Sequence, residues 1–307
     1  MKELDTELKR SMQKAILSWY KKNKRKFLWR DNESPYVILV SEIMLQQTQV
    51  NRVKEKLPKF LKLFPSIHSL SRTSRSDVIR AWKGMGYNNR AIRLQECAKM
   101  IVERHRGNIP ETFEELLELP GIGNYTASAI CVFAFGKNLP VVDVNIRRVY
   151  SRMFWNVKTT SALQTENKIQ QLAEEIFPKN KSSECHQAIM DIGAMFCTAR
   201  SPKCNDCIVN RFCLSANKMK VVVPKKKGEK LYRGKPHRYW RGKIVDVLRN
   251  SLDGKFVSSQ EVLENLFSTE RKNDARFLKT IVTALTKDNV VEMLLSKGDS
   301  FLLRLSQ

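Results

Sequence analysis

Four cysteines in one short stretch constrain the fold of this chain more than any other sequence feature. They follow the spacing C-x6-C-x2-C-x5-C, at Cys197, Cys204, Cys207 and Cys213. Four thiolates held that closely form a closed metal site, which holds either a tetrahedral zinc ion or a four-iron cluster. Because cysteines fill all four positions, such a site has no open position for a reactive water. We therefore expect the metal to shape a loop and to take no direct part in chemistry.

The charge of the chain indicates a polyanionic partner. Its 307 residues include 55 Lys and Arg against 31 Asp and Glu, a formal net charge of +24. The basic residues are spread along the chain and do not gather on one amphipathic helix, which favours nucleic acid over an anionic membrane. The sequence has no apolar run as long as a membrane span and no hydrophobic signal core near its start. We expect an intracellular, cytoplasmic protein.

Helical periodicity dominates residues 1 to 217, and alternation typical of strands is absent there. One helix is predicted to begin at Ser34-Pro35 and to continue to residue 50. A second begins at the capping box of Thr112 and Glu115. Two more are predicted over residues 124–135 and 143–154. The first two-thirds of the chain are therefore predicted to be all-α.

The composition changes after the cysteines. Residues 218–238 are basic, contain Pro and Gly, and are predicted to form a linker. Within residues 239–307 we predict three helices, one starting at the Ser258 capping box and one capped by Asp274. Two extended runs follow, on either side of a turn at residues 297–299. Three helices followed by a hairpin resemble a winged-helix domain.

A short turn between two predicted helices, Pro120-Gly121-Ile122-Gly123, is the second strong motif. Gly121 and Gly123 are expected to permit positive φ and close approach of a ligand. Backbone amides of such a turn, with a helix N-terminus behind it, point at an anion. The turn resembles a helix-hairpin-helix phosphate clamp, and an ordinary αα-hairpin is the alternative.

The order of these motifs identifies a family. Asp143 follows the hairpin by about twenty residues and opens a predicted helix, where an aspartate is commonly an N-cap. The hairpin, this aspartate and the four cysteines together resemble the endonuclease III superfamily of helix-hairpin-helix DNA glycosylases. The match is closest to MutY-type adenine glycosylases. The segments that carry the resemblance are residues 41–50, 84–94, 110–130, 141–149 and 187–204.

The resemblance implies a fold, a cofactor and an activity. The fold is a two-lobed, all-α glycosylase domain over residues 1–217, whose loop at 197–213 holds a [4Fe-4S] cluster, with zinc as the alternative. The activity is that of base excision repair. A mispaired adenine opposite 8-oxoguanine or guanine is flipped out, and hydrolysis of its N-glycosidic bond leaves an abasic site.

Three residues carry the expected chemistry. Glu42 is the acid that protonates the base, and burial beside Ile38, Ile43 and Met44 would favour its neutral form. Asp143 is the ionised partner that stabilises or attacks the sugar cation. Tyr125 occupies the position where the lyase branch has a Schiff-base lysine, and a phenol cannot form that intermediate. We therefore expect no AP-lyase activity.

The remaining candidate residues contact DNA. The resemblance implies that Gln46, Gln47 and Tyr87 wedge into the duplex, and that the hairpin residues Gly121 and Gly123 face the backbone. Arg200 and Lys203, beside the cysteines, are expected to contact phosphates. The expected partner is double-stranded DNA with a mispaired or damaged base, bound by a monomer at the nucleoid and not at a membrane.

The C-terminal region departs from the family pattern. MutY-type enzymes usually carry a MutT-like domain that reads the oxidised guanine, whereas residues 239–307 have a winged-helix pattern. Two alternatives therefore stay open. One is a glycosylase that removes thymine or uracil from G·T and G·U mispairs. The other is a non-catalytic DNA-binding protein on the same scaffold.

Overall fold

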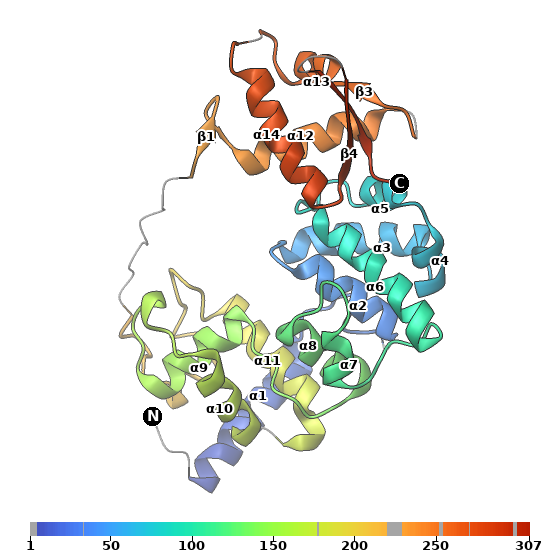
Figure 1. Ribbon diagram of the computed structural model, residues 1–307. Coiled ribbons are helices and arrows are strands. Elements are labelled where there is room, and N and C mark those ends of the chain that lie inside the picture. The colour runs from blue at the N-terminus through green and yellow to red at the C-terminus, as the bar shows by residue number, and fades with distance from the viewer. Residues whose placement is uncertain are drawn as a thin grey trace. The chain divides into compact units, whose positions relative to one another are not determined.

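A computed structural model of the chain describes residues 5–32, 34–176, 178–219, 229–251, 254–269, 271–296 and 300–307. The chain divides into two compact units (Figure 1). Unit 1 comprises Met1–Leu39, Glu111–Glu118 and Ile122–Lys226, and unit 2 comprises Val40–Pro110, Leu119–Gly121 and Lys227–Gln307. The chain therefore crosses between the units several times. Helix α2 (Pro35–Leu45) begins in unit 1 and ends in unit 2.

Unit 1 is a bundle of helices around one apolar core. Helix α1 buries Met12, Ile16 and Tyr20, spaced four residues apart, and packs on α11. Residues 126–132 of α8 are all buried, so this helix is apolar on every side and lies inside the bundle. The helices are α1 (Thr6–Asn23), α7 (Phe113–Leu117), α8 (Asn124–Phe135), α9 (Val144–Trp155), α10 (Glu166–Ile176) and α11 (Ser182–Met195). Short 3₁₀ turns lie at Thr160–Ala162, Lys179–Lys181 and Asn210–Phe212.

Unit 2 combines a helical part with the C-terminal region. The helical part contains the end of α2 and α3 (Val50–Leu63), α4 (Ile67–Arg72), α5 (Arg75–Ala81) and α6 (Asn89–His105). The C-terminal region contains β1 (Leu231–Tyr232), β2 (Lys235–Pro236), α12 (His237–Asn250), β3 (Val257–Ser258), α13 (Ser259–Leu266), α14 (Asp274–Lys287), β4 (Val291–Leu295) and β5 (Phe301–Leu305).

The predicted pattern of three helices and a hairpin is present in the C-terminal region. Strands β4 and β5 pair antiparallel, with Met293 opposite Leu303, and β3 adds to the far edge of β5. The predicted turn at 297–299 lies outside the described residues, as do residues 220–228 of the predicted linker. The remainder of that linker contains the β1–β2 hairpin and the start of α12, so it is not irregular throughout.

The capping predictions are confirmed at α7, α9 and α13, and one prediction is wrong. Thr112 accepts the amide of Glu115, Asp143 caps α9, and Ser258 accepts the amide of Glu261. The N-cap of α14 is Asn273 and not Asp274. Asp274 is fully buried, and its carboxylate accepts hydrogen bonds from Arg233 and from the Tyr232 hydroxyl, which fix the β1–β2 hairpin to α14.

Two arginines join the C-terminal region to the helical part of unit 2. Arg249 of α12 donates to the carbonyl of Ile79 near the end of α5, at 3.0 and 2.9 Å. Arg80 of α5 donates to the carbonyls of Arg249 and Ser251 at the end of α12. Each arginine thus donates to carbonyls at the C-terminus of the other helix. The last carbonyls of a helix have no amide partner within that helix. Ile79 and Ile92 complete the contact by joining the apolar core of the C-terminal region.

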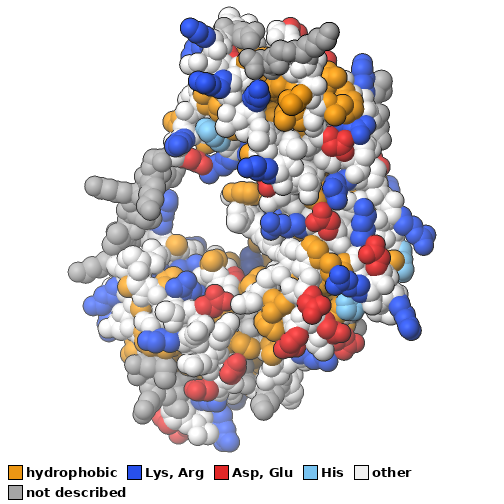
Figure 2. All heavy atoms as spheres, viewed as in Figure 1, with side chains coloured by type: hydrophobic (Ala, Val, Ile, Leu, Met, Phe, Trp, Pro, Cys, Tyr) orange, Lys and Arg blue, Asp and Glu red, His pale blue; other side chains and the backbone are white. Residues whose placement is uncertain are grey.

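Basic side chains are distributed widely over the visible face of each unit (Figure 2). No helix in the described part of the chain is long and apolar enough to cross a membrane.

Candidate functional site

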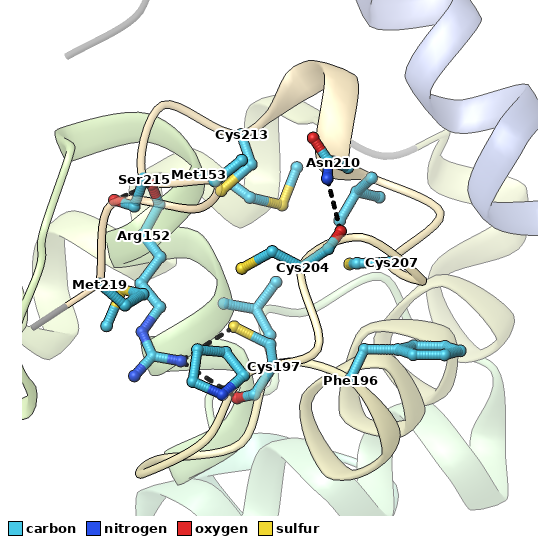
Figure 3. Close-up of a pocket in the computed structure, with 14 residues that line it drawn as sticks. Arg152, Met153, Phe196, Cys197, Cys204, Cys207, Asn210, Cys213, Ser215 and Met219 are labelled. Carbon is cyan, nitrogen blue, oxygen red and sulfur yellow. Dashed lines mark hydrogen bonds between the residues drawn. The ribbon is translucent and has the colours of Figure 1, made fainter. Parts of the chain in front are cut away.

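The four cysteines line a single cavity in unit 1. Apolar side chains, including Val149, Met153 and Val209, make up much of the remaining wall. Figure 3 shows the cysteines on the loop around this cavity, with the Asn210 amide bonded to the carbonyl of Cys204. Among the described residues, no three His, Cys, Asp or Glu side chains are arranged to hold a single metal ion.

The chemistry of these thiols fits a resident cluster. Burial raises the pKa of Cys207 to about 12 and that of Cys213 to about 11. Buried thiols keep their protons unless a cation replaces them, and iron is such a cation. Cys197, Cys204, Cys207 and Cys213 would hold the cluster, which would supply a rigid fold for the loop.

Helix α9 is bonded to the cysteine loop by two arginines one turn apart. Arg152, 1% exposed, donates to Cys197 Sγ at 3.2 Å and to the carbonyl of Thr198 at 2.7 Å. Arg148 donates to the carbonyls of Cys197 and Gly193 at 2.6 and 2.9 Å. The loop geometry is therefore fixed to the same helix that Asp143 caps. Sequence reasoning gave neither arginine a role.

Asp143 is held at the N-terminus of α9 by three donors. The amides of Asn145 and Ile146 donate to Oδ1 at 2.9 and 2.7 Å, and the Asn145 side chain donates to Oδ2 at 2.7 Å. The carboxyl keeps some solvent contact, yet the surrounding protein raises its pKa because desolvation outweighs these hydrogen bonds. An aspartate so placed is both an N-cap and a fixed, poorly solvated anion.

Two further contacts position this carboxylate. Arg148 donates to Asn145 Oδ1 at 2.7 Å, which orients the amide that bonds Asp143. A Cβ on Gly193 of α11 would lie 2.7 Å from Asn145 Cβ, so the close approach of α11 to this site requires glycine there. His186 of α11 accepts the amide of Val141 at 3.1 Å. The sequence gave His186 no functional signal, because a buried histidine is usually structural.

The hairpin is present, and its two glycines differ. Gly121 has φ +83°, and a Cβ there would lie 3.0 Å from Arg93 Cβ. Gly123 has φ −111° and is the N-cap of α8, so the expectation of positive φ at this residue is wrong. Gly123 and Asn124 are exposed at the start of α8, while Tyr125 packs half-buried against the core of unit 1. The amides at this helix start are therefore open to an anion.

Glu42 lies on α2 and is 4% exposed. The neighbouring Ile38, Ile43 and Met44 are buried as expected. The helix ends at Leu45, earlier than predicted, so Gln46 and Gln47 lie in the following turn. Gln46 Nε2 donates to the carbonyl of Gly121 at 3.2 Å, and exposed Gln47 has φ +54°.

Arg90 organises the residues predicted to wedge into DNA. It is 7% exposed, and its guanidinium donates to carbonyls of Met44 and Met85 at 2.9 and 3.0 Å and to Gln46. Its charge lies 5.6 Å from the ring centroid of Tyr87. Tyr87 itself is 51% exposed at φ +45°. One buried arginine thus holds both the turn after α2 and the turn before α6.

Arg200 and Lys203 are exposed on the cysteine loop, as contacts with phosphates would require. Glu42, Gln46, Gln47 and Tyr87 belong to unit 2, whereas Asp143, Tyr125 and the cysteines belong to unit 1. Gly121 lies in unit 2, at a crossing between the units.

Comparisons with known proteins show which family this chain belongs to. Residues 40–178 match the HhH-GPD superfamily of base excision DNA repair proteins, and residues 197–213 match the iron-sulfur binding domain of endonuclease III. The adenine DNA glycosylase of Mycobacterium tuberculosis is 34% identical over 270 residues, which cover 87% of each chain. A thermostable thymine-DNA glycosylase is 31% identical, with a TM-score of 0.63 over 68% of this chain and 97% of that one. Endonuclease III in a DNA complex, 21% identical, has a TM-score of 0.61 over 70% of this chain and 98% of that one.

The fold and the cysteine loop define a base excision DNA repair protein of the HhH-GPD superfamily that carries an iron-sulfur cluster. Within that superfamily, the chain belongs to the adenine DNA glycosylase family.

Proposed function

We propose that this chain hydrolyses the N-glycosidic bond of a flipped adenine mispaired with 8-oxoguanine or guanine, leaving an abasic site. The observation that carries the proposal is the similarity to an adenine DNA glycosylase along 87% of both chains. The buried Glu42 and the desolvated Asp143 supply the pair of carboxyl groups that such a reaction needs.

The two carboxyl groups have different tasks. Glu42 protonates the base, which makes the adenine a better leaving group. Asp143 stays ionised and stabilises the positive charge that develops on the sugar. Three hydrogen bonds already orient its carboxylate, so little reorganisation is needed during reaction.

Tyr125 makes the enzyme monofunctional, because its phenol cannot form a Schiff base with the abasic sugar. The chain therefore acts without AP-lyase activity.

The remaining residues bind and open the duplex. Gln46, Gln47 and Tyr87 occupy the space that the flipped nucleotide leaves. The amides at Gly121 and Gly123, with Arg200 and Lys203, bind phosphates. The cluster is of the [4Fe-4S] type. Residues 1–217 form the glycosylase domain of a monomer, and the winged-helix-like domain of residues 239–307 is bonded to the β1–β2 hairpin that precedes it.

One oligonucleotide panel tests this function. The holoprotein is incubated with duplexes that contain A·8-oxoG, A·G, G·T, G·U or no mispair, and released bases and abasic sites are measured. Adenine release from the first two, with strand breaks only after alkali, is expected. The Asp143→Asn variant should bind the same duplexes while releasing adenine at least about 100-fold more slowly.

The same panel tests the alternative substrates, thymine or uracil in G·T or G·U mispairs. Thymine or uracil release that exceeds adenine release would replace the proposed substrate. Tight binding without release of any base would indicate a non-catalytic protein.

A further inference from the structure

A groove in unit 2 lies between the turn before α6 and the first turn of α12. It has a volume of about 610 Å³. Tyr87 and Asn88 form one wall, Arg238, Tyr239 and Arg241 form the other, and Asp288 lies at the end of α14. The groove therefore joins a turn predicted to enter DNA with a region of the chain that has no assigned role.

Two exposed tyrosines face this groove. Tyr87 is 51% exposed and Tyr239 is 39% exposed. Tyr239 packs edge-on against Trp240, with ring centroids 5.1 Å apart, and its own ring lies 5.7 and 5.8 Å from the ammonium groups of Lys235 and Lys243. An aromatic ring between two cations suits a partner with flat bases and anionic phosphates.

The charge around the groove has the matching sign. Arg238 and Arg241 line the groove, and the ammonium groups of Lys235 and Lys243 lie near the Tyr239 ring. The acidic groups there are Glu229 and Asp288, each already paired with an arginine, Arg238 at 3.1 Å and Arg241 at 2.5 Å. Four basic side chains against two acidic ones leave this surface positive, which attracts a nucleic acid strand.

The two walls are fixed to each other before any ligand binds. Arg249 of α12 donates to Asn88 Oδ1 at 2.9 Å, and Asn88 adjoins Tyr87. The same guanidinium holds the carbonyl of Ile79, and Arg80 holds that of Ser251 at 3.2 Å. A preformed groove loses less entropy on binding than one assembled by its ligand.

We propose that this groove binds one strand of the DNA substrate beside the extruded nucleotide, with a base stacked on Tyr239 and phosphates against Lys235 and Arg238. The proposal rests on the proposed function, because that function places Tyr87 in the duplex. The C-terminal region is thus a DNA-binding part of the enzyme, and it acts through β2 and the first turn of α12.

Affinity measurements on the full holoprotein test the groove. The probe is a duplex with a stable abasic-site analogue opposite guanine, titrated at several salt concentrations. Tyr239→Ala should weaken binding at least about fivefold, whereas Tyr239→Phe, which keeps the ring, should stay within about twofold of the parent protein. Arg238→Ala should reduce the slope of log affinity against log salt by about one.

Arg276→Ala is the matched control, since Arg276 is an exposed arginine on α14 outside the groove. It should leave the salt slope unchanged. If Tyr239→Ala binds like the parent and Arg238→Ala keeps the full slope, the groove does not bind DNA. A reduced salt slope in Arg276→Ala alone would place the phosphate contact on α14 and overturn the proposal. If Tyr239→Ala fails to fold, the salt slope of Arg238→Ala alone tests whether the groove binds DNA.

Base release and DNA affinity are measured separately, so failure of the groove proposal can be distinguished from failure of the proposed glycosylase activity. Base release by the parent protein on the mispair panel tests the glycosylase activity alone. If the parent releases adenine while the Tyr239 and Arg238 variants bind normally, only the groove proposal fails. If no base is released but these variants still lose affinity, only the proposed activity fails.

Discussion

At the scale of single residues, poorly solvated charged side chains fix the local geometry of the candidate site. Asp143 is a carboxylate placed where water is scarce, and its pKa is raised although three donors bond it. Arg90 is a cation placed among backbone carbonyls, and burial lowers its pKa to about 10. Each charge is costly to bury, so each fixes the groups that compensate it.

The raised pKa of Asp143 predicts the acid limb of the pH–rate profile. In the proposed mechanism Asp143 acts in its ionised form, so the single-turnover rate should fall as pH drops through this raised pKa. The fall should begin above the ordinary aspartate value of about 3.9. Binding of the abasic-analogue duplex over the same range is the control. A rate that stays level down to that ordinary value would contradict the role given to Asp143.

Arg90→Ala should destabilise the protein and disorder the predicted wedge. The substitution removes the guanidinium that donates to the carbonyls of Met44, Gln46 and Met85, at about 1–3 kcal/mol for each buried group left unsatisfied. Denaturant unfolding should show the loss, and affinity for the abasic-analogue duplex should fall. Arg90→Lys should restore only part of the stability and part of the DNA affinity, because an ammonium cannot reproduce the hydrogen bonds of the guanidinium group. Full rescue by lysine would show that charge alone matters.

At the scale of elements, α9 connects the parts of unit 1. Its N-terminus carries Asp143, and its buried face carries Arg148 and Arg152, which bond the cysteine loop. The segment just before α9 is held by His186 of α11 through the Val141 amide. A single helix thus relates the carboxylate to the cluster loop and to α11.

His186 predicts how stability depends on pH. Its Nδ1 lies 2.7 Å from the carbonyl of Ser182 and carries the proton, while Nε2 accepts from Val141, so the native ring is neutral. Burial lowers its pKa. The unfolded chain therefore binds a proton that the native chain does not, and stability should fall as pH drops below about 6.5, by up to about 1.4 kcal/mol per pH unit.

Denaturant unfolding of the parent and of His186→Gln between pH 5 and pH 8, a range set around that value, measures this slope. The variant should lose the part of the slope that one histidine contributes. Identical slopes in the two proteins would mean that His186 does not titrate differently in the folded state. The comparison variant is His68→Gln, which replaces a histidine of unit 2.

At the scale of the whole molecule, the two units depend on different kinds of stabilisation. Unit 1 contains the cluster loop, whose four thiols face a common cavity. The C-terminal region of unit 2 depends on its apolar core and on the reciprocal bonds of Arg80 and Arg249. Loss of the cluster should therefore affect the units unequally.

Removal of the cluster should loosen unit 1 selectively. Without iron, the raised pKa values of Cys207 and Cys213 leave these thiols protonated, and the loop loses its shared centre. Hydrogen exchange should increase over residues 197–213 and the end of α9, while α12 and α14 keep their protection. Visible absorbance and iron content verify the removal. Equal loss of protection in both units would contradict this division.

Local patterns predicted much of the fold. Helix periodicity and capping residues located α2, α7, α8, α9 and α13, and cysteine spacing identified the cluster loop. These signals depend on neighbours within a few residues, so they are visible in the sequence. They fail where a side chain has a distant partner, as at Asp274, whose carboxylate bonds Arg233 and is no N-cap.

The tertiary structure decided how distant segments meet. Arg90, Arg148 and Arg249 each bond carbonyls that lie far along the chain, and every residue has a carbonyl, so no residue pattern reveals those partners. The groove beside Tyr239 likewise lies between distant segments that Arg249 joins through its hydrogen bond to Asn88. The sequence by itself determined the cysteine spacing, the predicted helices and the family resemblance. The three-dimensional packing determined which side chains hold Asp143, Tyr87 and the C-terminal region in place.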